Sequence, residues 1–127
     1  MSLLKLYRLA TIAATPLASA GLNWRAKYGK EDPARLAERM GESHRARPTG
    51  RLVWLHGASL GESLSLLPLI DRFIQRGLDV LVTSGTVSSA RVLSARLPAG
   101  AFHQYAPLDA PKFVDRFLDH WRPDIAV

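Results

Sequence analysis

The sequence predicts an α/β fold in which helices flank a parallel sheet, preceded by a separate N-terminal helix. From Arg51 to Val127, short apolar runs alternate with segments of helical periodicity. The chain of 127 residues is long enough for one domain of ordinary size. Its residues are 47% hydrophobic and 22% charged, which is typical of a globular protein.

The first predicted strand covers residues 52–56, an apolar run typical of a strand that is buried on both faces. Apolar side chains then recur at helical spacing over residues 61–76, and Gly77 is expected to end this helix. Asp109 is expected to cap the last helix. The remaining predicted strands are 79–83, 101–105 and 124–127, and the remaining helices are 88–97 and 109–121. This alternation argues for a Rossmann-like parallel sheet with right-handed crossovers.

Ligands of such sheets bind outside the carboxyl ends of the strands. Loops 57–61, 84–88 and 106–110 are therefore predicted to form the functional edge. The final predicted strand runs into the last residue of the sequence, so we expect the domain to be incomplete.

Residues 9–22 form an apolar segment that Pro16 interrupts. The segment is shorter than the ~20 residues that cross a bilayer as a helix. A cleaved signal peptide ending near Ala18-Ser19-Ala20 and a buried core helix are two possible interpretations. An interfacial membrane anchor is favoured, because aromatic and basic residues flank the segment. The absence of cysteine counts mildly against export.

The net charge of +6 belongs entirely to the N-terminal part of the chain. Residues 1–51 contain ten Lys or Arg and four acidic residues, whereas residues 52–127 are balanced. Such a segment is typical of contact with lipid headgroups or nucleic acid, or of a solvated arm. The adjacent apolar segment favours a membrane surface, and no nucleic-acid partner is expected.

Residues 31–50 are predicted to be a short helix followed by a linker. Asp32 is expected to cap the helix, Pro33 fits its first turn and Gly41 follows its last turn. Residues 43–50 are polar and rich in turn formers. We therefore divide the chain into a membrane-associating helix with a basic flank (1–30), this helix and linker (31–50), and an α/β domain (51–127).

The loop after the first strand carries the most informative chemistry. Glu62 falls in the first turn of the following helix, where the helix dipole favours its ionised form. An ionised carboxylate at the mouth of the sheet has the properties of a general base. Position alone favours the simpler interpretation, in which Glu62 only caps the helix.

The same loop contains Gly57-x-Ser59-x-Gly61, the pattern of a hydrolase nucleophile elbow. A serine hydrolase with Ser59 as nucleophile and Asp109 and His120 as partners is thus an alternative. It is weakened because the loop follows the first strand and no HGGG-like stretch precedes it. No Walker motif, cofactor motif or metal-ligand spacing is present, so neither a cofactor nor a metal is predicted.

Five stretches together resemble the bacterial 3-deoxy-D-manno-octulosonic acid (Kdo) transferases, over essentially the whole chain. They are the basic stretch 25–36, the stretch Trp54–Glu62, the second-strand loop Val82–Ala90, and the segments 105–109 and 116–124. Gly57 and Leu60 differ from the commonest residues of the family at their positions, a minor departure.

This resemblance implies the acceptor-side, N-terminal half of a GT-B glycosyltransferase. Such an enzyme transfers Kdo from CMP-Kdo to the lipid A precursor, in lipopolysaccharide core biosynthesis at the cytoplasmic face of the cell inner membrane. Glu62 then corresponds to the catalytic base. The basic segment 25–51 would meet the acceptor's phosphates and anionic lipids, with Arg25, Lys27 and Lys30 as the contacts. Acceptor contacts are expected from His56, Ser59, Gly61, Thr83, Ser84, Gly85 and Thr86.

The family pattern continues beyond the last strand into a donor-binding domain, which this sequence does not contain. We therefore expect this chain alone not to transfer Kdo. A third alternative is a non-catalytic module that docks on membranes or binds the acceptor.

Overall fold

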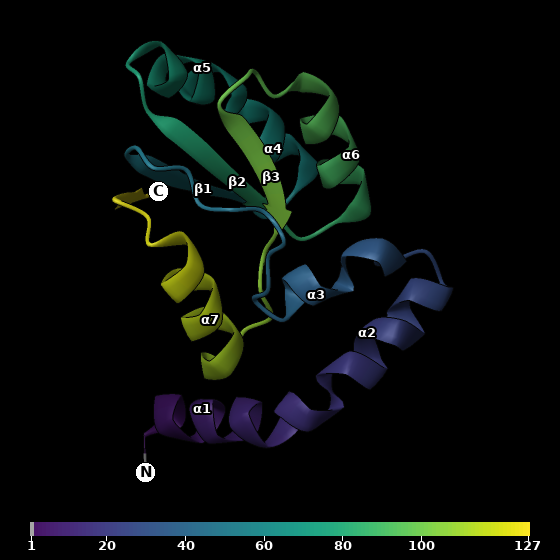
Figure 1. Cartoon of the computed structure of the whole chain (residues 1–127). Coiled ribbons are helices and arrows are strands. Elements are labelled where there is room, and N and C mark those ends of the chain that lie inside the picture. Colours follow the sequence, from purple (N-terminus) through teal and green to yellow (C-terminus); the bar gives the residue numbers. More distant parts are fainter. Residues whose placement is uncertain (1) are drawn as a thin grey trace.

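The computed structural model describes residues 2–127 and has a four-stranded parallel sheet at its centre (Figure 1). The strands are β1 (Leu52–Gly57), β2 (Asp79–Ser84), β3 (Ala101–Tyr105) and β4 (Ile125–Ala126). Their order is β3-β2-β1-β4, and all neighbours are parallel. The α/β class and the four predicted strands are therefore confirmed.

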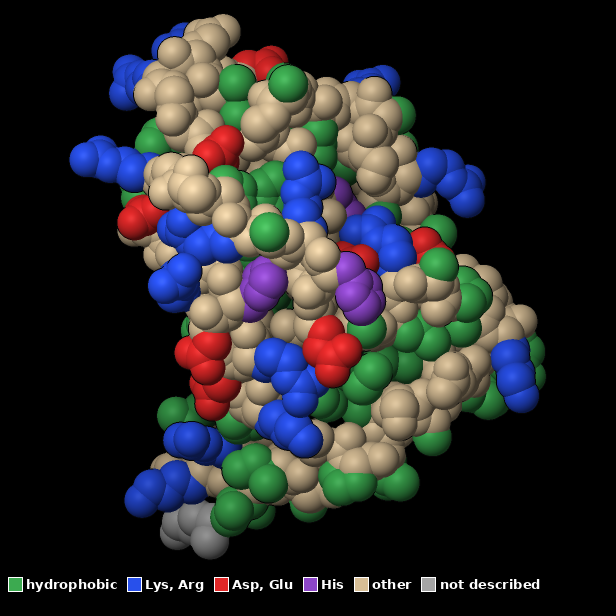
Figure 2. Space-filling model, in the orientation of Figure 1, with side chains coloured by type: hydrophobic (Ala, Val, Ile, Leu, Met, Phe, Trp, Pro, Cys, Tyr) green, Lys and Arg blue, Asp and Glu red, His purple; other side chains and the backbone are tan. Residues whose placement is uncertain are grey.

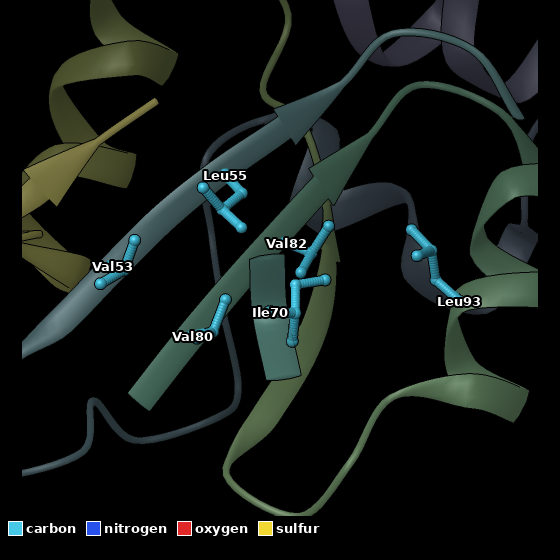
Figure 3. Packing of buried hydrophobic residues seen from close by; sticks show 6 residues of the cluster. All are labelled: Val53, Leu55, Ile70, Val80, Val82 and Leu93. Atoms are coloured by element: carbon cyan, nitrogen blue, oxygen red, sulfur yellow. The ribbon is translucent and has the colours of Figure 1, made fainter. Parts of the chain in front are cut away.

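Helices cover both faces of the sheet, as a parallel sheet requires. One face packs against α4 (Leu60–Ser65), α5 (Leu67–Gln75) and α6 (Val87–Arg96), and the other against α7 (Pro111–Trp121) (Figure 1). Alternate residues of a strand point to opposite faces, so β1 and β2 each supply residues to two cores. The first contains Val53, Leu55, Ile70, Val80, Val82 and Leu93 (Figure 3), and the second contains Leu52, Leu81, Phe102, Phe117 and Trp121.

Two sequence predictions about helices were wrong in detail. The helix predicted over 61–76 is two helices, because Pro68 has no N–H to continue the hydrogen-bonding ladder between them. Asp109 does not cap α7. That helix starts at Pro111, whose fixed φ suits a first helical position, and Ala110 is its N-cap. Asp109 instead accepts a hydrogen bond from the hydroxyl of Tyr7.

The N-terminal segment forms α1 (Leu3–Ala14), the 3₁₀ turn η1 (Thr15–Leu17) and α2 (Ala18–Lys27). Pro16 lies in the first turn of η1, at the predicted interruption. No residue of α1 is buried, so α1 is not a core helix. Among residues 2–127, no helix combines the length and the apolar character that crossing a bilayer requires.

The next segment, η2 (Pro33–Arg35) and α3 (Leu36–Arg39), lies across the carboxyl end of β3 (Figure 1). Asp32 caps η2 as predicted, accepting from the backbone N–H of Ala34 at 3.0 Å. The contacts continue beyond α3. The Arg47 guanidinium donates to the carbonyl of Trp121 at 2.6 Å and binds Asp124, which in turn accepts from the backbone N–H of Leu52. Packing of the α/β domain thus includes residues upstream of Arg51.

Gly41 allows the chain to pass close to α7. Its φ is +81°, a conformation that favours glycine, and a Cβ atom there would lie 2.1 Å from the carbonyl oxygen of Phe113. Backbone atoms of α7 would have to move to admit any side chain at this position.

We expect Gly41→Ala to lower the free energy of unfolding by about 2 kcal/mol or more, because left-handed strain and a backbone clash add. Gly77→Ala is the matched control. Gly77 has a φ of +79° but open space around its Cβ position, so it should lose only about 1 kcal/mol. Urea denaturation of the two variants measures the difference, and equal losses would contradict a close approach at Gly41.

Candidate functional site

The side chains of Ser59 and Glu62 together cap the N-terminus of α4. The Ser59 hydroxyl accepts from the backbone N–H of Glu62 at 3.2 Å, and the Glu62 carboxylate accepts from the backbone N–H of Ala58 at 2.7 Å. This is a variant of the capping box, in which a serine and a glutamate three residues later satisfy free N–H groups. The predicted capping role of Glu62 is therefore present in the structure.

Capping occupies only one of the two oxygens of the Glu62 carboxylate. Only Oε2 takes part in the bond to Ala58, and no residue within 2–127 forms a hydrogen bond with Oε1. The side chain is exposed at the carboxyl end of β1. One oxygen thus fixes the orientation of the carboxylate, while the other can accept a proton from a bound hydroxyl.

The rest of the loop is shaped by a close approach between β1 and α4. Gly57 is buried, and a Cβ atom there would lie 2.9 Å from the backbone of Ser63. Gly61 is exposed in the first turn of α4, and a Cβ atom there would meet nothing closer than Ser59 Oγ at 4.0 Å. The steric need for glycine is therefore at Gly57, which the sequence did not single out as a site residue.

His56 and Thr83 lie on the face of the sheet that packs against α7. The Thr83 hydroxyl bonds both His56 Nδ1 and Trp54 Nε1, each at 2.9 Å. Thr83 is fully buried, so it orients His56 and its side chain does not meet solvent. His56 is exposed and lines an apolar pocket of about 460 Å³ together with Trp54, Pro107 and Val114.

Ser84 lies on the opposite face and binds His103. The Ser84 hydroxyl is buried and lies 2.8 Å from His103 Nε2, and the Arg35 guanidinium lies 3.1 Å from His103 Nδ1. Arginine can only donate, so Nδ1 accepts and the neutral ring donates from Nε2 to Ser84. Burial and the nearby Arg35 charge lower the pKa of His103 to about 3.

A second pocket, of about 420 Å³, lies between the N-terminal segment and the start of α6. We call it the basic pocket because Arg25, Lys30 and Arg91 line it together with Gly85, Thr86, Val87 and Ser88. It unites two of the predicted phosphate-contact residues with two of the predicted acceptor-contact residues. Lys27 is exposed but does not line this pocket. Sequence reasoning missed Arg91, because an exposed helical arginine is usually solvated.

The predicted site residues thus fall into three groups along one edge of the sheet. Glu62, Ser59 and Gly61 form the exposed start of α4, His56 opens onto the α7 side, and Gly85 and Thr86 open into the basic pocket. The side chains of Thr83 and Ser84 are buried beneath them. Within residues 2–127, no group of three or more His, Asp or Glu side chains is arranged to hold a metal ion.

The geometry does not support a serine-hydrolase triad. Ser59 has extended backbone angles (φ −122°, ψ 169°), not the strained turn of a nucleophile elbow. Asp109 precedes α7 and His120 lies in its last turn, so a helix of 11 residues, roughly 16 Å long, separates them. His120 bonds the carbonyl of Arg45.

Comparison with known proteins identifies relatives along the whole chain. A sequence model described as 3-deoxy-D-manno-octulosonic-acid transferase (kdotransferase) matches residues 34–127. A protein of Arabidopsis thaliana named probable 3-deoxy-D-manno-octulosonic acid transferase, mitochondrial, is 40% identical over 125 residues, covering 97% of this chain and 28% of the relative.

Two bacterial relatives carry the name 3-deoxy-D-manno-octulosonic acid transferase. The protein of Rickettsia bellii is 36% identical over 98% of this chain and 30% of its own length. The protein of Haemophilus influenzae is 31% identical over 73% of this chain and 22% of its own length. The chain thus spans less than a third of each of these relatives. No solved structure gives a significant match.

The neutral state of His103 makes stability depend on pH. An unfolded histidine has a pKa near 6.5, whereas that of folded His103 is about 3, so below pH 6.5 the unfolded state binds a proton that the folded state does not. The contribution of His103 to the free energy of unfolding is therefore fully present above pH 6.5, and it is lost as the pH falls from 6.5 toward 3. We expect His103→Gln to make the decline between pH 6.5 and 5 shallower by up to about 1 kcal/mol per pH unit.

Urea denaturation at a series of pH values measures this slope, and exposed His44 provides the control. His44→Gln should leave the slope unchanged. A His103→Gln variant with the slope of the unmodified chain would contradict a neutral, buried His103.

Proposed function

Because this chain belongs to the 3-deoxy-D-manno-octulosonic acid transferase family, we propose that it forms the acceptor-binding part of a Kdo transferase. The whole enzyme transfers Kdo from CMP-Kdo to the lipid A precursor in lipopolysaccharide biosynthesis. The chain corresponds to the N-terminal half of a GT-B fold. The donor is bound by a second domain, and the relatives, of which this chain covers 28% and 30%, are long enough to contain one.

Glu62 is the catalytic base in this proposal. A hydroxyl of the acceptor sugar binds Oε1 and gives up its proton to the carboxylate. The hydroxyl oxygen then forms a bond to the anomeric carbon of Kdo, while the bond from that carbon to the CMP phosphate breaks and CMP leaves with the electron pair. No cofactor takes part in this step.

The observation that carries the proposal is the geometry of the Glu62 carboxylate. The hydrogen bond from Ala58 to Oε2 fixes its orientation, and Oε1 is left exposed at the carboxyl edge, where ligands of parallel sheets bind. A base held in one orientation requires little reorganisation when the proton moves.

The acceptor lies along this edge, between Glu62 and the basic pocket. His56, oriented by Thr83, contacts it from the α7 side, and Ser59, Gly61, Gly85 and Thr86 line its path from the α4 and α6 side. The buried Thr83 and Ser84 hydroxyls do not reach the acceptor. They lie beneath this edge and hold His56 and His103 by hydrogen bonds.

The N-terminal segment holds the protein on the cytoplasmic face of the inner membrane. Leu3, Leu6, Leu9 and Leu17 are between 53% and 83% exposed. Hydrophobic side chains gather along the lower edge of the molecule, where α1 and α2 lie (Figure 2). An exposed apolar helix followed by Arg25, Lys27 and Lys30 is suited to the interface of an anionic membrane.

Replacement of Glu62 by Gln separates the two roles of this residue. A glutamine amide oxygen can still accept from Ala58 and cap α4, but it cannot take up a proton at neutral pH. We expect Glu62→Gln to lower kcat for Kdo transfer by about 100-fold or more with an unchanged melting temperature. The assay uses a chimera in which this chain replaces the matching segment of the Rickettsia bellii transferase.

Asp32→Ala is the matched control, because it removes another carboxylate cap, that of η2, without touching the proposed site. It should lower the melting temperature, with a cost of about 1 kcal/mol, and leave most of the activity. A Glu62→Gln chimera that stays within threefold of the unmodified chimera would remove Glu62 as the base.

The membrane contact is tested with the double variant Leu6→Glu/Leu9→Glu, which places two charges on the exposed surface of α1. Binding of the 127-residue chain to vesicles of phosphatidylethanolamine and phosphatidylglycerol should weaken by at least about tenfold, because two leucines no longer enter the interface. Leu69→Glu, at an exposed leucine of α5, should leave binding unchanged. Equal binding of all three proteins in a flotation assay would contradict a role for α1.

A further inference from the structure

Within residues 2–127, β3 is an edge strand, with β2 on one side and no strand on the other. The hydrogen bonds of a parallel ladder recur at every second residue. Val80 donates its backbone N–H to the carbonyl of Gly100 at 3.0 Å, so the even-numbered residues of β3 bond β2. The backbone groups of residues 101, 103 and 105 therefore point away from the sheet.

An edge of this kind is a template on which another strand can pair. The sequence of β3 is Ala-Phe-His-Gln-Tyr, which has two aromatic residues and no proline. None of its side chains is charged at neutral pH, because His103 is held neutral. Uncharged strands of high β propensity are the ones that associate when their edges are exposed. The β3 edge therefore needs protection.

The ion pair of Arg35 and Glu38 occupies the place of a neighbouring strand. In a parallel sheet, one residue of the neighbouring strand donates to a carbonyl and accepts from the N–H two positions later. Here Arg35 Nη2 donates to the His103 carbonyl at 3.1 Å, and Glu38 Oε1 accepts from the Tyr105 N–H at 3.0 Å. One nitrogen and one oxygen thus make the two bonds that a strand residue opposite Gln104 would make.

The ion pair is fixed in this position by further contacts. Arg35 Nε and Nη2 bind the two oxygens of Glu38 at 2.6 and 2.7 Å, a bidentate geometry that holds both side chains in one plane. The Arg35 guanidinium also lies over the Tyr105 ring, 4.6 Å from its centroid. Both side chains are largely shielded from solvent. The pair is therefore a constant part of the edge, unlike a solvated surface pair.

We infer that the Arg35–Glu38 pair closes the β3 edge against a second copy of this chain. Without the pair, two copies of β3 fit side by side in antiparallel orientation, centred on His103 of each. The N–H and carbonyl of His103 would bond those of the other His103, and the Tyr105 N–H would bond the Ala101 carbonyl of the other copy.

The second copy is the occupant that the edge fits best. Antiparallel pairing of one strand with itself has twofold symmetry, so the same groups are complementary in both copies. No like charges face each other across it, because the strand is uncharged. The inference does not depend on Kdo transfer, since neither Glu62 nor the basic pocket takes part.

The double variant Arg35→Met/Glu38→Met removes both bonding groups and leaves the net charge unchanged. In sedimentation equilibrium, its mass should rise with concentration toward twice that of the unmodified chain, with an unchanged circular dichroism spectrum. Arg116→Met/Glu42→Met is the matched control, because it removes another ion pair between the N-terminal segment and the domain. It should keep the mass of the unmodified chain. Both variants retain the exposed leucines of α1, so any association through α1 is common to both.

Hydrogen exchange identifies the surface that pairs. The His103 N–H points away from β2 and has no hydrogen-bond partner among residues 2–127. Its exchange should slow by at least about tenfold when the double variant associates, because it then belongs to a ladder. The single variants Arg35→Met and Glu38→Met each free one edge group and should associate more weakly. They decide the question if the double variant does not fold.

A folded double variant that stays monomeric would overturn the inference, as would folded, monomeric single variants if the double variant is unfolded. Association that leaves exchange of the His103 N–H unchanged would assign the contact to another surface and would also overturn it. Equal association of the Arg116→Met/Glu42→Met control would attribute the effect to general loosening of the N-terminal segment, with the same consequence.

Discussion

The position of the N-terminal segment depends on one charged contact with the carboxyl end of β3. The Glu38 carboxylate accepts from the backbone N–H of Tyr105 at 3.0 Å and binds Arg35, whose guanidinium reaches His103 and lies over the Tyr105 ring. Arg39 adds bonds to Ala106 and Leu108. Without this contact, the basic residues that follow α2 would not be held beside α6, and the basic pocket would have no second wall.

This contact also explains why the sequence predicted the domain better than its surroundings. Each strand has a local signal, since Val80 and Val82 point to one core and Leu81 to the other, and a buried parallel strand needs apolar residues on both faces. Pairing between Arg35 and His103 has no such signal, because the two residues are 68 positions apart and each is ordinary in its own neighbourhood. The break at Pro68 and the start of α7 at Pro111 were readable in principle, but helical periodicity outweighed the prolines.

The same difference between local signals and long-range contacts applies to the candidate site. Local reasoning found the β1–α4 loop and Glu62, because a strand, a turn of small residues and a helix N-terminus are adjacent in sequence. It did not find that Thr83 and Ser84 face inward on opposite sides of the sheet, each binding one histidine, since strand parity must be combined with the packing of α7 and α6. Arg91 escaped for a similar reason. Its place in the basic pocket depends on α2, which only the folded chain brings near.

The long separation in sequence between α3 and the residues that it contacts has a consequence for biosynthesis. Arg35, Glu38 and Arg116 form bonds across 67 to 76 positions, so the N-terminal segment cannot dock until β3 and most of α7 have been synthesised. At about 5–20 residues per second, translation leaves the exposed leucines of α1 undocked for several seconds. During this interval the nascent chain presents an apolar helix to its surroundings. During synthesis, α1 can therefore contact a membrane close to the ribosome, or a chaperone, before it can dock on its own domain.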